Sequence, residues 1–270
     1  MQVVDFMRAV FEVLDRYTMK DRVCVEQAVN NPPAKQTTRR ILFCAITSSR
    51  SMFLIMIRAL VFDFDGLILD TETCIIDAWV QVHAQAGLTC VRQEALDLIG
   101  EVDHEFDLWK AFGPDADRRA LKQEHRRFTR AFLEKQTLLP GVLERLDEAR
   151  QLGLSLAIAS NSPHTWIDRH LPRLGLVEYF QTIRCRDDVV RGKPEPDVYH
   201  AVLAKLGLEG REAIAFEDSS AGSLAANRAG LRCVAVPNDC TRHHDFAHAD
   251  LRVASLAEVS LNALLAQWSN

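Results

Sequence analysis

Short apolar runs alternate with longer amphipathic segments from residue 58 onward. The apolar runs have the length and composition of buried strands, and they span residues 59–64, 154–159, 213–216 and 231–236. The segments between them repeat apolar residues at helical spacing, most clearly over 141–151, 198–206 and 221–229. Because strands that are apolar throughout must be covered on both faces, the pattern predicts a parallel sheet between two layers of helices.

One long segment interrupts this alternation directly after the first predicted strand. Residues 71–137 contain no convincing strand, only helical patterns at 75–85, 94–99 and 116–134. An insertion at that point would lie above the carboxyl end of the strand, where open α/β sheets bind ligands. We therefore predict a doubly wound, Rossmann-like α/β core over residues 58–71 and 138–270, with an all-helical cap domain inserted at 72–137.

Residues 1–57 form an N-terminal extension of uncertain order. An amphipathic pattern over residues 4–17 is compatible with a helix, but the Asn-Asn-Pro-Pro sequence at 30–33 would end it. Met56 comes directly before the first predicted strand. We expect an appendage or an over-long gene start here, in preference to a folded accessory helix or a targeting arm.

Composition and charge narrow the class of protein. The chain has 48% hydrophobic and 26% charged residues, which is typical of a soluble globular protein. Its formal net charge of -5 opposes binding to nucleic acid, which is held by clustered Lys and Arg. The apolar clusters 41–47 and 52–57 are shorter than the roughly 20 residues that span a bilayer. We expect a monomer with no nucleic-acid or membrane partner.

The cysteines and the N-terminal residues give evidence on the cellular compartment of the protein. The seven cysteines include no CxxC pair and no metal-finger spacing, which favours a reducing environment. The first residues mix charged and apolar side chains, unlike a secretory signal with its basic start and plain apolar run. Both observations favour a cytoplasmic location.

The first predicted strand ends in two acids and a glycine, in the sequence Val-Phe-Asp63-Phe-Asp65-Gly66. Residues two apart on an extended chain face the same side, so Asp63 and Asp65 would share a small volume. Such carboxylates repel each other unless a proton or a cation joins them, and Mg²⁺ suits oxygen ligands of this kind. The alternative is a turn at Asp65 and a helix cap at Asp63.

Three further polar clusters follow predicted strands or precede helices. Ser160 and Asn161 follow the second strand and are suited to a phosphate at a helix start, although such a serine is often only an N-cap. Lys193 lies between Gly192 and Pro194, where a fixed cation would neutralise phosphate, although most lysines are solvated.

The third cluster is the acidic pair Glu217 and Asp218, at the end of the run 213–216. By itself this pair could be only a helix start. Together the four clusters contain a nucleophile, a neighbouring acid, a phosphate anchor, a cation and further acids for a metal. These are the groups that phosphoryl transfer through an enzyme carboxylate requires.

In this order, the motifs resemble those of the haloacid dehalogenase-like phosphohydrolases. The resemblance covers residues 58–265 and is to the branch with a helical cap after the first strand, which includes β-phosphoglucomutase and many sugar-phosphate phosphatases. The matching motifs are Asp63-Phe-Asp65-Gly with the lead-in Leu67 to Glu72, Ser160, Gly192 to Asp197, and Glu217-Asp218-Ser219.

The resemblance implies a role for each matched residue. Asp63 would attack phosphorus, and Asp65 would protonate the departing oxygen and then draw a proton from water. Mg²⁺ would be held by the Asp63 side chain, the Asp65 backbone carbonyl and Asp218, with Glu217 further from the ion. Ser160 and the backbone of Asn161 would hold phosphate oxygens, and Lys193 would offset the charge on Asp63 and the phosphoryl group.

Departures from the mutase motifs decide which reaction we expect. Ile75 stands where the mutase has a histidine, and Pro163-His164 replaces its Lys-Asn pair. Glu101 and Asp103 lie where the mutase presents an arginine to a second phosphate, and acids there would repel a bisphosphate. We therefore predict a phosphatase acting on a small phosphorylated metabolite. The alternatives are a sugar-phosphate mutase and a non-catalytic module that binds a phosphorylated ligand.

The predicted cap is expected to set specificity. Candidates to face the crevice are Glu72, Trp79, His83, His104 and Trp109. The two tryptophans have an alternative role in filling the interior of the cap, as large aromatic residues usually do. Three histidines near residue 245 lack a companion ligand pattern and are more typical of a solvated loop: His243, His244 and His248.

Overall fold

A six-stranded parallel sheet forms the centre of the computed structural model, which describes residues 56–90, 92, 95 and 109–269. Its strand order is β3-β2-β1-β4-β5-β6. The strands are β1 (Ala59–Phe62), β2 (Ser155–Ala159), β3 (Thr182–Arg184), β4 (Ala213–Glu217), β5 (Arg232–Ala235) and β6 (Leu251–Arg252). The four predicted strands are confirmed. The edge strands β3 and β6, of three and two residues, are too short to produce an apolar run.

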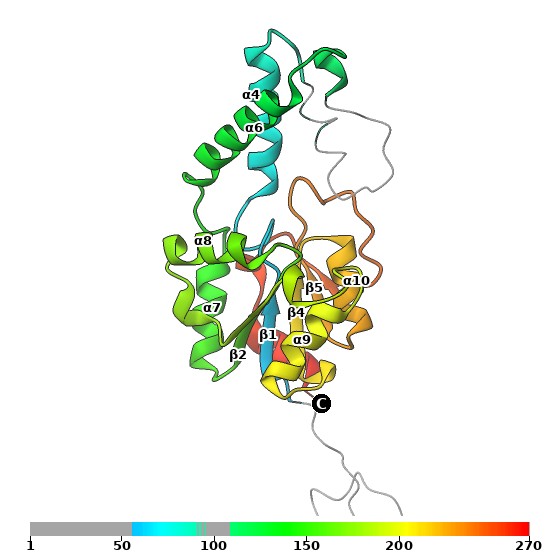
Figure 1. Ribbon diagram of the computed structural model, residues 1–270. Coiled ribbons are helices and arrows are strands. Elements are labelled where there is room, and N and C mark those ends of the chain that lie inside the picture. Colours follow the sequence, from blue (N-terminus) through cyan, green and yellow to red (C-terminus); the bar gives the residue numbers. More distant parts are fainter. Residues whose placement is uncertain (1–55, 91, 93–94, 96–108, 270) are drawn as a thin grey trace, which may run out of the picture. The chain divides into compact units, whose positions relative to one another are not determined.

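Helices cover both faces of the sheet (Figure 1). One apolar cluster joins Leu60 and Phe62 of β1 to α7 (Val142–Gln151), α8 (His164–Leu174) and α11 (Leu261–Trp268). A second cluster joins Ala59 and Val61 to α9 (Asp197–Leu206) and α10 (Ser220–Arg228). Alternate residues of one strand therefore contact opposite helical layers. This confirms the doubly wound α/β core.

The segment between β1 and α7 contains helices but no strand of the sheet among its described residues. It contains α4 (Glu72–Gln85), η2 (Lys110–Phe112) and α6 (Arg118–Leu133), and α4 and α6 lie side by side (Figure 1). The Asp117 side chain begins α6 by accepting hydrogen bonds from the backbone N–H groups of Arg119 and Ala120. The insertion of an all-helical cap is thus confirmed, whereas the helix predicted over 94–99 lies outside the described residues except at 95.

The remaining described elements are short. Four further 3₁₀ helices connect the core elements: η3 (Val177–Tyr179), η4 (Arg186–Asp188), η5 (Gly210–Glu212) and η6 (Leu256–Glu258). Within the described ranges, no helix combines the length and apolar character needed to cross a bilayer. The predictions for the N-terminal extension concern residues that lie, apart from 56 and 57, outside the description.

The central strands bring separate parts of the sequence to one edge. Phe62 of β1 pairs in register with Ile158 of β2 and with Phe216 of β4. The backbone N–H of Asp63 continues this ladder by donating to the Phe216 carbonyl at 3.0 Å. Residues that follow these three strands therefore emerge together at the carboxyl edge of the sheet.

Candidate active site

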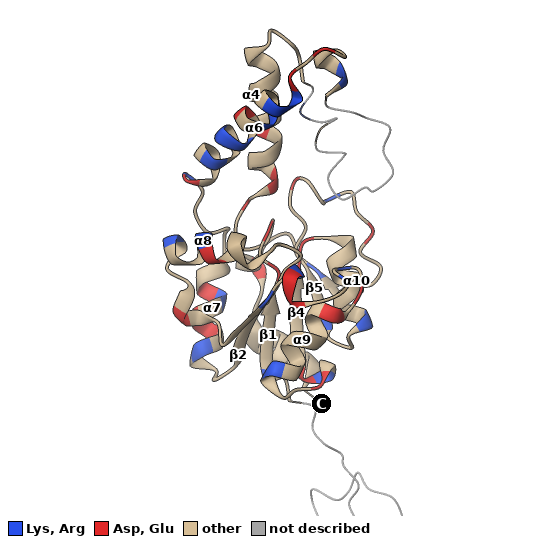
Figure 2. Cartoon of the chain, viewed as in Figure 1, with Lys and Arg blue, Asp and Glu red and all other residues tan. Residues whose placement is uncertain are grey.

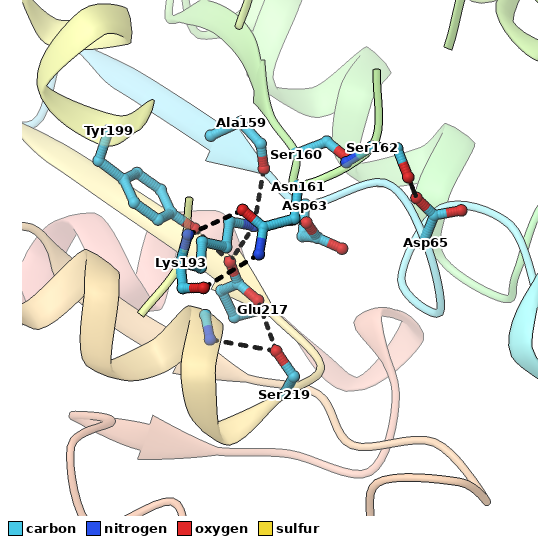
Figure 3. Close-up of polar contacts among 11 residues, drawn as sticks. Asp63, Asp65, Ala159, Ser160, Asn161, Ser162, Lys193, Tyr199, Glu217 and Ser219 are labelled. Atoms are coloured by element: carbon cyan, nitrogen blue, oxygen red, sulfur yellow. Dashed lines mark hydrogen bonds and ion pairs between the residues drawn. The ribbon is translucent and has the colours of Figure 1, made fainter. Parts of the chain in front are cut away.

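A buried lysine joins two of the predicted acids. Lys193 Nζ lies 2.5 Å from Asp63 Oδ1 and 2.6 Å from Glu217 Oε1, and it also donates to the Ala159 carbonyl at 2.8 Å. Its side chain is only 4% exposed. Figure 3 shows the lysine beside Asp63, which follows β1, and Glu217 of β4, with a contact to the carbonyl at the end of β2. The structure thus brings together residues that are far apart in the sequence.

The Asn161 side chain holds the loop that carries this lysine. Its Oδ1 accepts from the Lys193 backbone N–H at 2.8 Å, and its Nδ2 donates to the Lys193 carbonyl at 3.1 Å. A Cβ on Gly192 would come within 2.6 Å of Asn161 Oδ1, so the close approach of the two loops requires glycine. The sequence singled out the backbone of Asn161, whereas the structure adds this bracing by its side chain.

Glu217 has a second buried partner that sequence reasoning missed. The Tyr199 hydroxyl donates to Glu217 Oε1 at 2.5 Å, and both residues are fully buried. On the sequence, Tyr199 follows helical apolar spacing and is indistinguishable from a core residue. The position of Glu217 between Lys193 and Tyr199 directs its carboxylate toward internal partners.

Asp218 lies with Asp63 and Glu217 in a three-carboxylate group. One carboxylate oxygen from each residue lies within 4.8 Å of the others, and all three residues are buried. Asn238, which was not predicted, donates from Nδ2 to Asp218 Oδ2 at 2.9 Å and to Glu72 Oε2 at 3.0 Å. It therefore connects the predicted metal acid to the first residue of α4.

A glycine is needed beside this group. Gly66 has a φ of +76°, a left-handed conformation that side chains disfavour. A Cβ at this position would also overlap the Asp218 carboxylate and the Asn238 amide. The Asp63-Phe-Asp65-Gly66 sequence thus meets a steric requirement as well as a chemical one.

Asp65 is held apart from the three-carboxylate group. Its Oδ2 accepts from Ser162 Oγ at 2.6 Å, and its Oδ1 accepts from Trp166 Nε1 at 2.8 Å. Figure 3 shows the Asp65 carboxylate beside Ser162. Both acids follow β1, but the chain turns after that strand, and Asp65 has partners that Asp63 lacks.

Ser160 follows β2 at the same edge of the sheet. It is 1% exposed, and its Oγ accepts from the Ser162 backbone N–H at 2.9 Å. The hydroxyl hydrogen therefore stays available for another acceptor while the serine is held in place. Because Ser162 also contacts Asp65, one short segment links the predicted phosphate anchor to the predicted acid.

The charges of the site are strongly perturbed by burial. Burial raises the pKa of Asp63, Lys193 lowers it, and Glu217 and Asp65 raise it further. Burial also raises the pKa of Asp218, reinforced by Glu72 and Asp63. For Lys193, burial lowers the pKa, but attraction to Asp63 and Glu217 outweighs that effect and the net change is upward.

Two effects on Asp63 oppose each other. The ion pair with Lys193 favours the ionised carboxylate, whereas burial raises the pKa of Asp63 and favours the protonated form. The Lys193 ammonium contacts two carboxylates, at 2.5 and 2.6 Å, and this attraction favours the ionised form of Asp63. When the Asp63, Glu217 and Asp218 group is ionised, one ammonium leaves two negative charges unbalanced. A divalent cation would relieve that repulsion, so the donor set fits Mg²⁺.

The other predicted residues divide into three sets. Glu72 reaches the site through Asn238. Trp79 packs in the helical insertion, with ring centroids 4.6 Å from Trp109 and 6.0 Å from His83, and His104 lies outside the description. Among described residues, neither group of possible metal ligands includes the histidines near residue 245.

Comparisons with known proteins agree with this fold. The model of a family described as haloacid dehalogenase-like hydrolase matches residues 60–236. The chain is 38% identical to YhcW of Bacillus subtilis (strain 168), covering 78% of this chain and 97% of that protein. It is 32% identical to hexitol phosphatase B of Escherichia coli (strain K12), covering 77% of this chain and 97% of that protein.

A solved structure extends the comparison to three dimensions. It is a mutant of CbbY from Rhodobacter sphaeroides in complex with xylulose-(1,5)bisphosphate. The TM-score is 0.61 at 28% identity, and the match covers 76% of this chain and 97% of the CbbY chain. The three matches therefore cover 76–78% of this chain and 97% of each relative.

Proposed function

This chain belongs to the haloacid dehalogenase-like hydrolase family, and we propose that it is a magnesium-dependent phosphatase acting on a small phosphorylated metabolite of the sugar-phosphate class. The observation that carries the proposal is the buried Lys193 between Asp63 and Glu217, with Asp218 in the same group. Hexitol phosphatase B, a relative over most of both chains, supports the choice of substrate class.

Magnesium would be held by the Asp63 side chain, Asp218 and the Asp65 backbone carbonyl. Glu217 would stay further from the ion, which agrees with its contacts to Lys193 and Tyr199. When bound, the cation supplies positive charge to the phosphoryl oxygens and to the surrounding acids. The excess of carboxylates over ammonium groups supports this assignment.

Asp63 would be the nucleophile. One of its carboxylate oxygens bonds to phosphorus while the bond from phosphorus to the substrate oxygen breaks, and this leaves an aspartyl-phosphate. The position of Asp63 is fixed by its backbone hydrogen bond to Phe216 and by the Lys193 ammonium. Lys193 would also offset the charge on the transferring oxygens, and Ser160 and the backbone of Asn161 would hold them.

Asp65 would move the protons. It would give a proton to the departing substrate oxygen and later take one from the water that attacks the aspartyl-phosphate. That attack releases inorganic phosphate and restores the Asp63 carboxylate. Ser162 and Trp166 hold both oxygens of Asp65, so its orientation is set by the loop and helix that follow β2.

A panel of phosphorylated metabolites tests the proposal. Purified protein is incubated with sugar phosphates, nucleoside monophosphates and p-nitrophenyl phosphate, and inorganic phosphate is measured with Mg²⁺ and after treatment with a chelator. We expect release from some sugar phosphates, loss of release on chelation and recovery when Mg²⁺ is restored.

Two results would contradict the phosphatase. Isomerisation of β-glucose 1-phosphate with little free phosphate would identify a mutase. Binding of sugar phosphates without turnover of any compound in the panel would identify a non-catalytic binding module.

A further inference from the structure

A cavity of about 570 Å³ lies between α6, α8 and Ile75 of α4, outside the three-carboxylate group. Four arginines line it, against a single acid, Glu134. They are Arg126 and Arg130 of α6 and Arg169 and Arg173 of α8. The basic character of α6 is visible along its length in Figure 2. The cavity is therefore strongly cationic.

These positive charges have few partners of their own. All four arginines are exposed, and Arg126, Arg130 and Arg169 form no ion pair with any described residue. Arg173 donates to the Gln136 carbonyl at 2.7 Å. By contrast, Arg127, also on α6 but outside the cavity lining, is paired with Glu124 at 2.7 Å. Three arginines without an acidic partner among the described residues thus meet on the lining of one cavity.

A buried histidine in the same lining also lacks a partner. His170 is only 5% exposed, and neither of its ring nitrogens has a hydrogen-bond partner among the described residues. Buried polar groups without a partner are uncommon in native structures, because losing water without forming a new hydrogen bond is costly. A ligand group in the cavity would satisfy this histidine.

The cavity adjoins the residues that hold Asp65. Trp166 lines the cavity and donates from Nε1 to Asp65 Oδ1. A second hollow of about 460 Å³ shares Trp166 and Arg169 with the first and also includes Ser162, whose Oγ donates to Asp65. Two residues therefore contact both the predicted acid and the cationic region.

We propose that the arginine-lined cavity binds a second anionic group, a phosphate or a carboxylate, on the part of the substrate that is not transferred. Arginine forks match the oxygens of both groups in bidentate fashion, and a cavity of this volume is in the range of small-ligand sites. The inference rests on the proposed phosphatase function and narrows its substrate class. The acids Glu101 and Asp103, which argued against a bisphosphate, lie outside the described residues.

Matched substrate pairs test the inference at constant ionic strength. Glycerol 3-phosphate is compared with 3-phosphoglycerate, and glucose 6-phosphate with glucose 1,6-bisphosphate, while p-nitrophenyl phosphate reports the reaction without a second anion. In the parent protein we expect a higher kcat/KM for the member with the second anion in at least one pair. Equal or lower values in both pairs would overturn the inference.

Variants from the two helices locate the effect. In Arg169→Ala and Arg130→Ala, we expect KM for the preferred second-anion substrate to rise about tenfold, the size expected for a lost hydrogen bond to a charged group. The kinetics with p-nitrophenyl phosphate should not change. Arg127→Ala is the matched control and should leave both unchanged. An equal effect of Arg127→Ala would indicate general electrostatic attraction and overturn the assignment to the cavity.

The remaining outcomes separate this inference from the proposed function. Failure of the parent protein to hydrolyse p-nitrophenyl phosphate and every metabolite would refute the phosphatase and with it the cavity assignment. Hydrolysis without preference for a second anion would refute only the cavity assignment. A non-competitive effect of free inorganic phosphate that Arg169→Ala abolishes would show that the cavity takes a separate anion, and would overturn its assignment to the substrate.

Discussion

Two cationic regions of this protein differ in how their charge is balanced. The Lys193 side chain is 4% exposed and contacts Asp63, which follows β1, and Glu217 at the end of β4, so its charge is balanced inside the protein. The arginines around the cavity are exposed, and three of them have no acidic partner among the described residues. The buried cation therefore holds two carboxylates in place, whereas the charge of the exposed cations is available to the anionic group that we propose.

The same difference predicts that the two regions respond unequally to salt and to substitution. Interactions of exposed charges are screened by salt, whereas buried pairs are screened much less. Removing one member of a buried pair leaves an uncompensated charge, which is costly for the folded state. Substitutions at Lys193 and its acids should therefore lower both the stability of the fold and the activity toward every substrate. Substitutions at the cavity arginines should lower activity only toward selected substrates.

The largest effect is expected from Asp63→Asn. The amide keeps the shape of the side chain but cannot supply the nucleophilic oxygen, so turnover should fall at least about a thousandfold. Unlike Arg169→Ala, this variant should lose activity toward p-nitrophenyl phosphate and all metabolites alike. The measurement is kcat on each substrate, with circular dichroism as a check of folding. Turnover within tenfold of the parent would rule out Asp63 as the nucleophile.

The next largest effect is expected from Lys193→Met. Without the ammonium, Asp63 and Glu217 lose their shared partner, and unfolding free energy should fall by about 3–5 kcal/mol. Turnover should fall about a hundredfold, because a cation near the transferring group is lost. Urea unfolding in the presence of a chelator measures the first effect, and phosphate release measures the second.

A second substitution makes the test of Lys193 specific. Glu217→Gln added to Lys193→Met removes one of the two unpaired charges, so it should restore part of the lost stability. The exposed Arg127→Ala variant should leave the unfolding free energy close to that of the parent protein. If Lys193→Met is as stable as the parent protein, the buried lysine does not balance the acids as described.

A smaller effect should appear in the pH dependence of stability. Burial raises the pKa of Glu72 from 4.5 to about 7, with the Asn238 hydrogen bond lowering it and Asp65 and Asp70 raising it. Because the folded pKa is the higher one, the stabilising contribution is complete below pH 4.5 and is lost as pH rises to about 7. The loss should not exceed about 4 kcal/mol.

The difference between parent and Glu72→Gln isolates this contribution. Tm is measured across that pH window in the metal-free protein, and the fall with rising pH should be smaller in the variant. The Asp63 and Asp218 carboxyls have raised pKa values as well, so they add a fall of the same sign in both proteins. Identical slopes in the two proteins would show that Glu72 does not ionise against a burial cost.

The sequence was most informative about polar residues at the ends of buried strands. Asp63, Ser160 and Glu217 were expected at one edge because their strands are parallel, and the structure places them there. Tyr199, Asn238 and the cavity were not expected. Asn238 lies 166 residues from Glu72, and no local pattern connects two residues at that separation. The partner of Asp65 on α8, Trp166, was missed for the same reason.

The sequence by itself determined the class of fold and which polar residues follow the central strands, because apolar runs define buried strands and parallel strands end together. Only the tertiary structure decided that arginines on α6 and α8 share a cavity beside Asp65. Exposed charges on separate helices are not constrained by the hydrophobic pattern. Whether these arginines lie close together depends on how the two helices pack. That packing is determined by burial of the apolar face of each helix, on the side away from the arginines.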